Sequence, residues 1–187
     1  MGLTGSDFTG MHRMGENTSK LLCGYNPEMI IFTACREDIP AWNELARQVE
    51  ALFGAPMAGD EEFQKILRRK IEQGLAFCIR EYDGMPGSAL CGGLFFSTRH
   101  RPVYQIGWLA VAEKWRRFGL GRALVLHALG LVIPPAEVIV TTFDVDDPEG
   151  EPARRFYASL GFSPAELLPG DGPNGETRQR YRMIITA

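Results

Sequence analysis

Apolar residues recur along the chain with two different periods. In two early segments they return every three or four positions, the spacing of helices that bury one face. Elsewhere they form short continuous or alternating runs bounded by glycine, proline and asparagine, which is typical of strands. In chain order, the predicted elements are a strand at 28–35, helices at about 40–53 and 63–71, strands at 75–82, 88–98 and 103–111, a helix ending near 132, a strand at 137–143, a helix at about 152–160, and strands at 162–168 and 180–186.

The order of these elements favours a mixed α/β (α+β) fold, with helices packed on a central, largely antiparallel sheet. Glycine and proline at residues 83–87 predict a hairpin. We expect the strand at 137–143 to enter the sheet beside the strand at 103–111. Residues 1–27 show no sustained periodicity, so we predict a flexible N-terminal leader there and one globular domain over residues 28–187.

Composition and charge exclude several kinds of partner. The formal net charge of −3 and the pI of about 5.7 give no basic field that would attract nucleic acid or an anionic membrane. No apolar run reaches about 18 residues, so we expect no membrane-spanning segment. The four cysteines lack metal-ligand spacing, and the acidic run 144–151 lacks the spacing of a calcium loop. We therefore predict no metal site, and free thiols in a cytoplasmic protein.

The segment 108–124 gives the clearest indication of a functional site. A strand-like apolar run passes through a turn rich in arginine and glycine into a helix rich in alanine and leucine. Gly119 and Gly121 lack Cβ atoms, so consecutive main-chain N–H groups can approach an anion where the helix begins. Neighbouring arginines add charge-assisted donors. The sequence therefore predicts a phosphate cradle.

Two other phosphate motifs do not fit this segment. A P-loop needs Gly-x-x-x-x-Gly-Lys-Ser/Thr, and the chain has no such run. A dinucleotide fingerprint needs a third glycine, but Leu124 occupies that place. The missing glycine argues against a nucleotide-dependent oxidoreductase.

The run 116–121, which reads Arg-Arg-Phe-Gly-Leu-Gly, resembles the acyl-CoA signature Gln/Arg-x-x-Gly-x-Gly/Ala of the GNAT superfamily of N-acetyltransferases. Residues 153–162 end in Tyr-Ala-Ser-Leu-Gly-Phe, which is similar to a late helix of that family. The likeness spans roughly residues 29–186. It implies a sheet of six to seven strands with splayed middle strands and about four flanking helices. It also implies acetyl-CoA as cosubstrate and direct acetyl transfer to a primary amine in a ternary complex.

The resemblance assigns roles to particular residues. Tyr157 corresponds to the general acid, and the main-chain amide of Val111 would face the thioester oxygen. The ordinary pKa of a phenol is above that of a thiol, so the site must lower the phenol pKa or stabilise the proton in flight. By the same resemblance, the cofactor-binding residues are Leu109, Ala110, Val111, Arg116, Arg117, Phe118, Gly119, Leu120, Gly121 and Arg122.

The acceptor side departs from the family pattern. Lysine-acetylating relatives carry Glu where this chain has Gln105, and many relatives carry Asn where it has Gly150. A glutamine cannot take a proton from the acceptor ammonium. The remaining candidates for the acceptor side are Tyr104, Asp144 and Asp146, with His100 and Glu113 as further candidate bases.

These features leave two function classes open. The first is an enzyme acting on a small-molecule amine or a peptide amine, which the acidic loop 144–151 would attract if it does more than face water. The second is an acyl-CoA-binding sensor or regulatory module with weakened catalysis. The resemblance also admits a homodimer formed through the closing strands.

Overall fold

The computed structural model describes residues 29–54, 56–82 and 84–187, and the predicted leader lies outside these ranges. Seven strands form one sheet in the order β1-β2-β3-β4-β5-β7-β6. All neighbouring strands are antiparallel except β4 and β5, which are parallel. The elements are β1 (Phe32–Thr33), η1 (Arg36–Asp38), α2 (Ile39–Phe53), α3 (Glu61–Glu72), β2 (Ala76–Arg80), β3 (Leu90–His100), β4 (Val103–Val111), η2 (Glu113–Trp115), α4 (Leu120–Leu129), β5 (Ala136–Phe143), η3 (Pro148–Gly150), α5 (Glu151–Ser159), β6 (Ser163–Leu168) and β7 (Arg178–Ile185).

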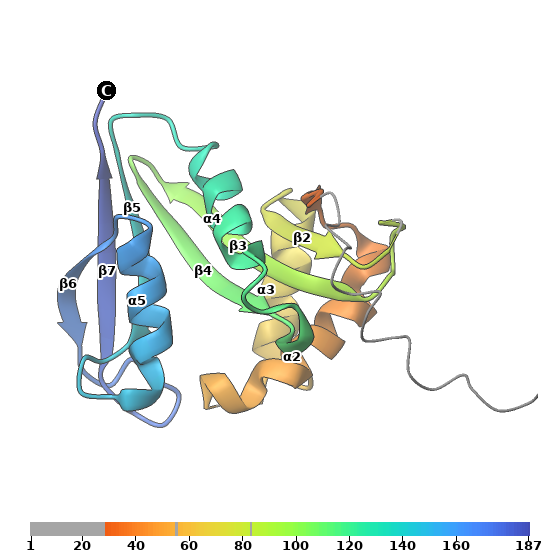
Figure 1. Ribbon diagram of the computed structural model, residues 1–187, viewed down its shortest axis with the longest axis horizontal. Helices are drawn as coiled ribbons and strands as arrows, with labels where there is room; N and C mark the ends of the chain where they lie inside the picture. Colours follow the sequence, from red (N-terminus) through yellow and green to blue (C-terminus); the bar gives the residue numbers. More distant parts are fainter. Residues whose placement is uncertain (1–28, 55, 83) are drawn as a thin grey trace, which may run out of the picture.

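Helices cover the sheet on both faces (Figure 1). α2 and α3 bury their apolar sides against one face of β2, β3 and β4. α4 and α5 cover the opposite face. α2 lies close to the sheet because Trp42 packs on Gly93 of β3, where an added Cβ would meet the indole ring at 2.5 Å. None of the helices in the described part of the chain combines the length and apolar composition that crossing a bilayer needs.

The structure confirms the predicted element order and the largely antiparallel sheet, and it moves several of the predicted boundaries. The first strand shrinks from 28–35 to Phe32–Thr33, because the chain turns at Cys35 into η1. The helix predicted to end near 132 ends at Leu129. The amides that follow it donate to carbonyls three residues back, as Val132 N does to Leu129 O, which is a tighter turn than an α-helix makes. The last strand begins two residues earlier than predicted, at Arg178.

The pairing of β4 with β5 stops partway along both strands. Cα pairing runs only from Val103–Ile106 against Glu137–Val140. At the same point β4 carries a bulge: Phe95 and Phe96 of β3 oppose Trp108 and Ile106, so Gly107 is the extra residue. Beyond the bulge β4 stays paired with β3 but parts from β5, and Figure 1 shows the two arms of the sheet diverging.

A buried ion pair joins the start of the domain to the β2–β3 hairpin. Arg80 donates to both carboxylate oxygens of Asp38, at 2.9 and 2.8 Å, and the side chain of Asp38 is fully buried. Burial raises the pKa of Asp38, but hydrogen bonds from Arg80 and from the amides of Cys35 and Gly87 outweigh it and lower the pKa to about 2. The stabilisation is therefore complete at neutral pH and is lost as the pH falls toward 2.

We expect Arg80→Met to lower the free energy of unfolding by about 3–5 kcal/mol, because it leaves the Asp38 carboxylate buried without its partner. Urea denaturation at pH 7 measures this change. Arg36→Met is the control, since the pair between Arg36 and Glu72 is exposed and such pairs contribute little. Equal stability of both variants would show that the buried pair does not hold the hairpin.

Candidate functional site

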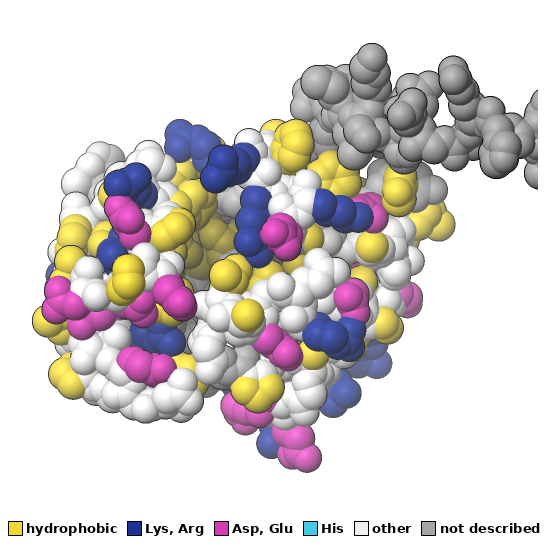
Figure 2. All heavy atoms as spheres, turned by 60° about the horizontal axis from the view of Figure 1, so that its bottom comes forward, with side chains coloured by type: hydrophobic (Ala, Val, Ile, Leu, Met, Phe, Trp, Pro, Cys, Tyr) yellow, Lys and Arg dark blue, Asp and Glu magenta, His cyan; other side chains and the backbone are white. Residues whose placement is uncertain are grey.

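A cavity of about 680 Å³ lies where β4 and β5 part. Its wall comes from the second half of β4, the end of β5, the first turns of α5 and the last turns of α2. Figure 2, which brings the lower side of Figure 1 forward, shows a hollow with apolar side chains inside it and Lys or Arg side chains along one margin.

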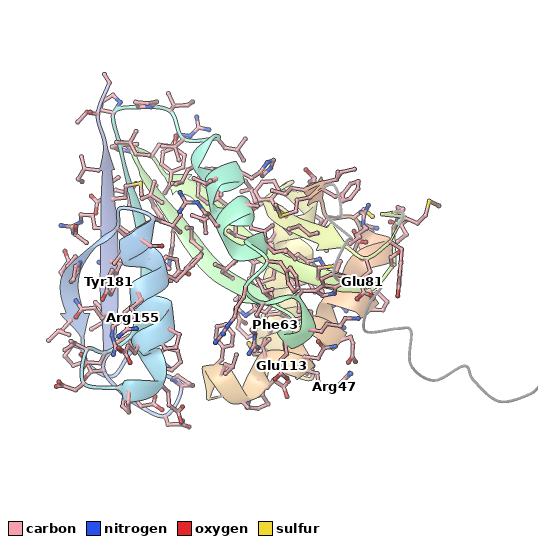
Figure 3. All side chains as sticks on the ribbon, in the orientation of Figure 1. Arg47, Phe63, Glu81, Glu113, Arg155 and Tyr181 are labelled. Atoms are coloured by element: carbon pink, nitrogen blue, oxygen red, sulfur yellow. The ribbon has the colours of Figure 1, made fainter. Side chains whose placement is uncertain are left out.

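The cavity passes through the sheet from one face to the other. Phe156 and Tyr157 line it from the α4/α5 face, whereas Leu52 and Phe53 line it from the α2 face. Figure 3 shows Phe63 on α3, beside one arm of the sheet, and Tyr181 on β7 in the other arm.

The main chain of β4 presents unpaired groups to this cavity. The amide of Ala112 donates to Cys91 O at 2.9 Å, and antiparallel pairing alternates, so Ala110 also turns its main chain toward β3. The main chains of Leu109 and Val111 therefore face the side that β5 has left. Nε of Arg116 donates to Val111 O at 3.1 Å, which agrees with this direction. The Val111 amide is thus free to donate into the cavity.

The predicted cradle forms the start of α4. Arg117 and Gly119 have positive φ angles of 67° and 82°, and Gly119 is the N-cap of the helix. The first intrahelical hydrogen bond runs from Ala123 N to Gly119 O, so the amides of residues 120–122 come before the ladder. Unpaired amides and the positive end of a helix dipole are the groups that an anion site requires.

The cradle residues differ in how they reach the cavity. Only Arg116 and Gly121 line it. Leu120 is buried in the core and offers only its amide. Arg117, Phe118 and Arg122 are exposed at the surface beside the cavity.

A buried carboxylate that the sequence analysis missed anchors this loop. Glu81 accepts a hydrogen bond from Nε1 of Trp115 at 2.7 Å and forms an ion pair with Lys114, and it is 6% exposed. The ring of Trp115 in turn contacts Phe118 at 6.2 Å between centroids. Glu81 thereby ties the end of the β2 segment to the residues that lead into the cradle. Only the fold brings residues 81 and 115 together, so the sequence carried no signal for this contact.

Tyr157 lines the cavity from α5, and its phenol accepts or donates no hydrogen bond within the described part of the chain. Its ring lies edge-on to Phe156 and Phe162, at 5.1 and 5.7 Å between centroids. Burial raises the pKa of Tyr157 above its ordinary value. The structure thus gives no lowering of the phenol pKa. It keeps the phenol protonated at neutral pH.

Gly150 explains one departure from the family pattern. A Cβ at this position would lie 2.2 Å from Cβ of Phe143 and 2.5 Å from Nη1 of Arg154. Nη1 of Arg154 also donates to the carbonyls of Asp144 and Asp147, which holds the loop in this conformation. A larger side chain at residue 150 would therefore displace the loop.

The acceptor candidates lie in different places. Tyr104 is buried in the core, stacked on Phe96, and its hydroxyl accepts from Ile133 N at 3.2 Å. Asp144 and Asp146 do not line the cavity, whereas Glu149 of the same acidic loop does. The further candidate bases, His100 and Glu113, are also outside the wall, and so is Gln105.

The described residues offer no group of three or more His, Cys, Asp or Glu side chains that could hold a metal ion. Cys35, Cys78 and Cys91 are free thiols, and Cys23 lies outside the described residues. Burial raises the pKa of Cys78 and of Cys91 to about 12, so both thiols stay protonated.

Several solved structures have a fold similar to that of this chain. Ard1 from Thermoplasma volcanium has a TM-score of 0.65 and 20% identity, over 84% of this chain and 98% of that one. The ribosomal-protein-S18-alanine N-acetyltransferase from Escherichia coli has a TM-score of 0.63 and 17% identity, over 84% and 94%. Arabidopsis thaliana NAA60, solved with acetyl-CoA, has a TM-score of 0.64 and 16% identity, over 83% and 99%. These likenesses show a shared fold.

No curated protein sequence gives a significant match. A profile of the Acetyltransferase (GNAT) family matches residues 39–162, more than half of the chain, and the protein therefore belongs to this family.

Proposed function

We propose that the protein is an N-acetyltransferase that moves the acetyl group of acetyl-CoA directly to a primary amine in a ternary complex. The observation that carries this proposal is the cavity through the sheet, because it joins the anion site at α4 to the unpaired main chain of β4 and to Tyr157. A donor and an acceptor that enter from opposite faces would meet at the end of β4.

The donor would bind from the α4/α5 face. The free amides at the start of α4 would hold the pyrophosphate, with Arg117 and Arg122 adding charge at the surface. The pantetheine arm would run along β4 and hydrogen-bond to the main chain of Leu109 and Val111. The main-chain groups of Leu109 and the Val111 N–H face the side that β5 has left, whereas the Val111 carbonyl already accepts from Nε of Arg116.

The chemical step would use few groups. The amine nitrogen attacks the thioester carbon, and the Val111 amide donates to the oxygen as negative charge develops there, a contact worth about 3 kcal/mol of barrier. The C–S bond then breaks, and Tyr157 gives its proton to the departing thiolate. The proton lost by the amine returns to the phenolate through solvent.

The acceptor amine must be in its neutral form when its nitrogen attacks the thioester. An alkyl ammonium at pH 7 loses that proton at a cost of about 4.6 kcal/mol, from its ordinary pKa. Glu149 supplies a carboxylate in the described wall, so we assign it the attraction of the ammonium at the mouth and the first step of a water-mediated proton path.

Two classes of acceptor and one alternative function follow. The similar structures include enzymes named for peptide or protein amines, which supports a peptide amine beside a small-molecule amine. The raised pKa of Tyr157 makes proton transfer to the thiolate harder. That observation favours the alternative of an acyl-CoA-binding sensor with weakened catalysis.

Thiol release from acetyl-CoA with a panel of amines, together with a thermal shift by CoA, tests the proposal. An enzyme gives both signals, and a sensor gives only the shift. Gly121→Glu should weaken CoA binding by about 100-fold or more, because it places a carboxylate beside the pyrophosphate. Gly121→Ala is the control, since its Cβ would make ordinary contacts of 3.5 Å with Phe156. Full affinity in Gly121→Glu would refute the cradle.

We expect Tyr157→Phe to lower kcat by at least about tenfold, because positioned proton donors contribute about 10²–10⁴ in rate. The affinity for CoA should stay the same, since the ring remains in place. Steady-state kinetics and calorimetric titration with CoA measure the two quantities. An unchanged kcat would remove Tyr157 from the acid role.

We expect Glu81→Leu to raise the KM for acetyl-CoA by about tenfold, equivalent to about 1.4 kcal/mol, with little change in kcat. The substitution leaves the Trp115 N–H without its acceptor and frees the loop before the cradle. Glu81→Gln keeps that acceptor and should restore the KM. A KM for acetyl-CoA that Glu81→Leu leaves unchanged would contradict the positioning role.

A further inference from the structure

The two sides of the cavity have different walls. The α4/α5 side carries the anion site and Arg116. The α2 side is built from large apolar side chains, namely Val49, Leu52, Phe53, Trp108 and Phe143. Since the donor would occupy the first side, the second side contacts the acceptor.

The aromatic part of this wall is held in place by its surroundings. Trp108 packs on Trp42 and Phe95 at 5.5 and 5.4 Å between ring centroids, and on Phe53 at 6.0 Å. On the opposite arm, the guanidinium of Arg178 lies 4.5 Å from the ring centroid of Phe143. The aromatic part of the apolar surface is therefore held in place by packing before any ligand binds.

Negative charge is scarce around the cavity as a whole. Glu149 supplies the single carboxylate that lines the cavity among the described residues. Glu50, on α2, accepts hydrogen bonds from the amides of Met57 and Ala58 at 2.8 and 2.7 Å, so it holds the following loop instead. Asp144 and Asp146 lie outside the wall. One carboxylate matches one ammonium, and it does not match a polyamine or an aminoglycoside.

We infer that the acceptor is a primary amine carried by a bulky apolar group, which packs against Leu52, Phe53 and Trp108 while the amine meets Glu149. This inference rests on the proposed function and adds the substrate class. Two sources present that chemistry: a free arylalkyl or alkyl amine, and a peptide whose first residue has a large apolar side chain.

An amine panel tests the inference with the full chain and acetyl-CoA. We expect kcat/KM for 2-phenylethylamine to exceed that for ethanolamine and for spermidine by at least about tenfold. In the peptide arm, a peptide beginning with Phe should exceed one beginning with Ser or Lys by a similar factor. The arm with the higher value identifies the source.

Preference for the polar or polycationic amines, or equal rates across the panel, would overturn the inference and leave the proposed function intact. Failure to acetylate any amine, with a thermal shift by CoA, would instead remove the proposed function.

A matched pair of variants locates the effect. Leu52 and Leu126 are 49% and 48% exposed, and each lies near the end of a helix, but only Leu52 lines the cavity. Leu52→Asp should lower kcat/KM for the preferred apolar amine by about tenfold and raise the relative rate with spermidine. Leu126→Asp should change neither value. Equal effects of both variants, or no effect of Leu52→Asp, would show that this wall does not select the acceptor.

Discussion

The parting of β4 from β5 is the feature on which the rest of the site depends. The N–H and C=O groups of a strand paired on both sides form hydrogen bonds with its neighbours. Among the described residues, β4 has no strand partner on one side beyond Ile106. Gly107 marks the point of change, because the bulge there alters which side chains face each layer of helices. Buried main-chain groups without partners are costly. In the proposed function, that cost is offset when pantetheine and the thioester oxygen take the place of β5.

The surrounding structure must keep β4 apart from β5 for the main chain of β4 to stay accessible. Two buried carboxylates, Asp38 before α2 and Glu81 after β2, join the elements around the cavity. Asp38 holds Arg80 and thereby fixes the start of α2 against the β2–β3 segment, and α2 supplies the apolar wall of the cavity. Glu81 holds Trp115 and Lys114, which lead into the anion site. One short stretch of β2 and its turn thus connects the walls on which the donor and the acceptor would lie.

The sequence predicted the elements and the turn into α4 because both depend on local patterns. Glycines at 119 and 121 specify this turn within a few residues, and periodicity specifies which segments are strands. The cavity wall and the contacts that support it join distant segments, so Leu52 and Glu81 were not predicted, and Glu149 was predicted only as part of the acidic loop 144–151. Tyr104 shows the same limit, since its place on β4 beside Gln105 did not reveal that its ring is buried in the core and its hydroxyl accepts a hydrogen bond from Ile133 N. One signal was present, because an isolated glycine within a strand pattern, such as Gly107, indicates a bulge.

The apolar wall affects the protonation state of the acceptor amine as well as the choice of acceptor. Transfer of an ammonium from water to an apolar surface disfavours its charged form and so lowers the pKa of the amine. The same burial raises the pKa of Tyr157 and keeps the phenol protonated. An amine that enters between Leu52, Phe53 and Trp108 is therefore driven toward the neutral, nucleophilic state, whereas Tyr157 stays protonated but becomes a weaker acid toward the thiolate. With Glu149 as the single carboxylate of the described wall, dehydration can supply part of the deprotonation that a strong general base would otherwise have to provide.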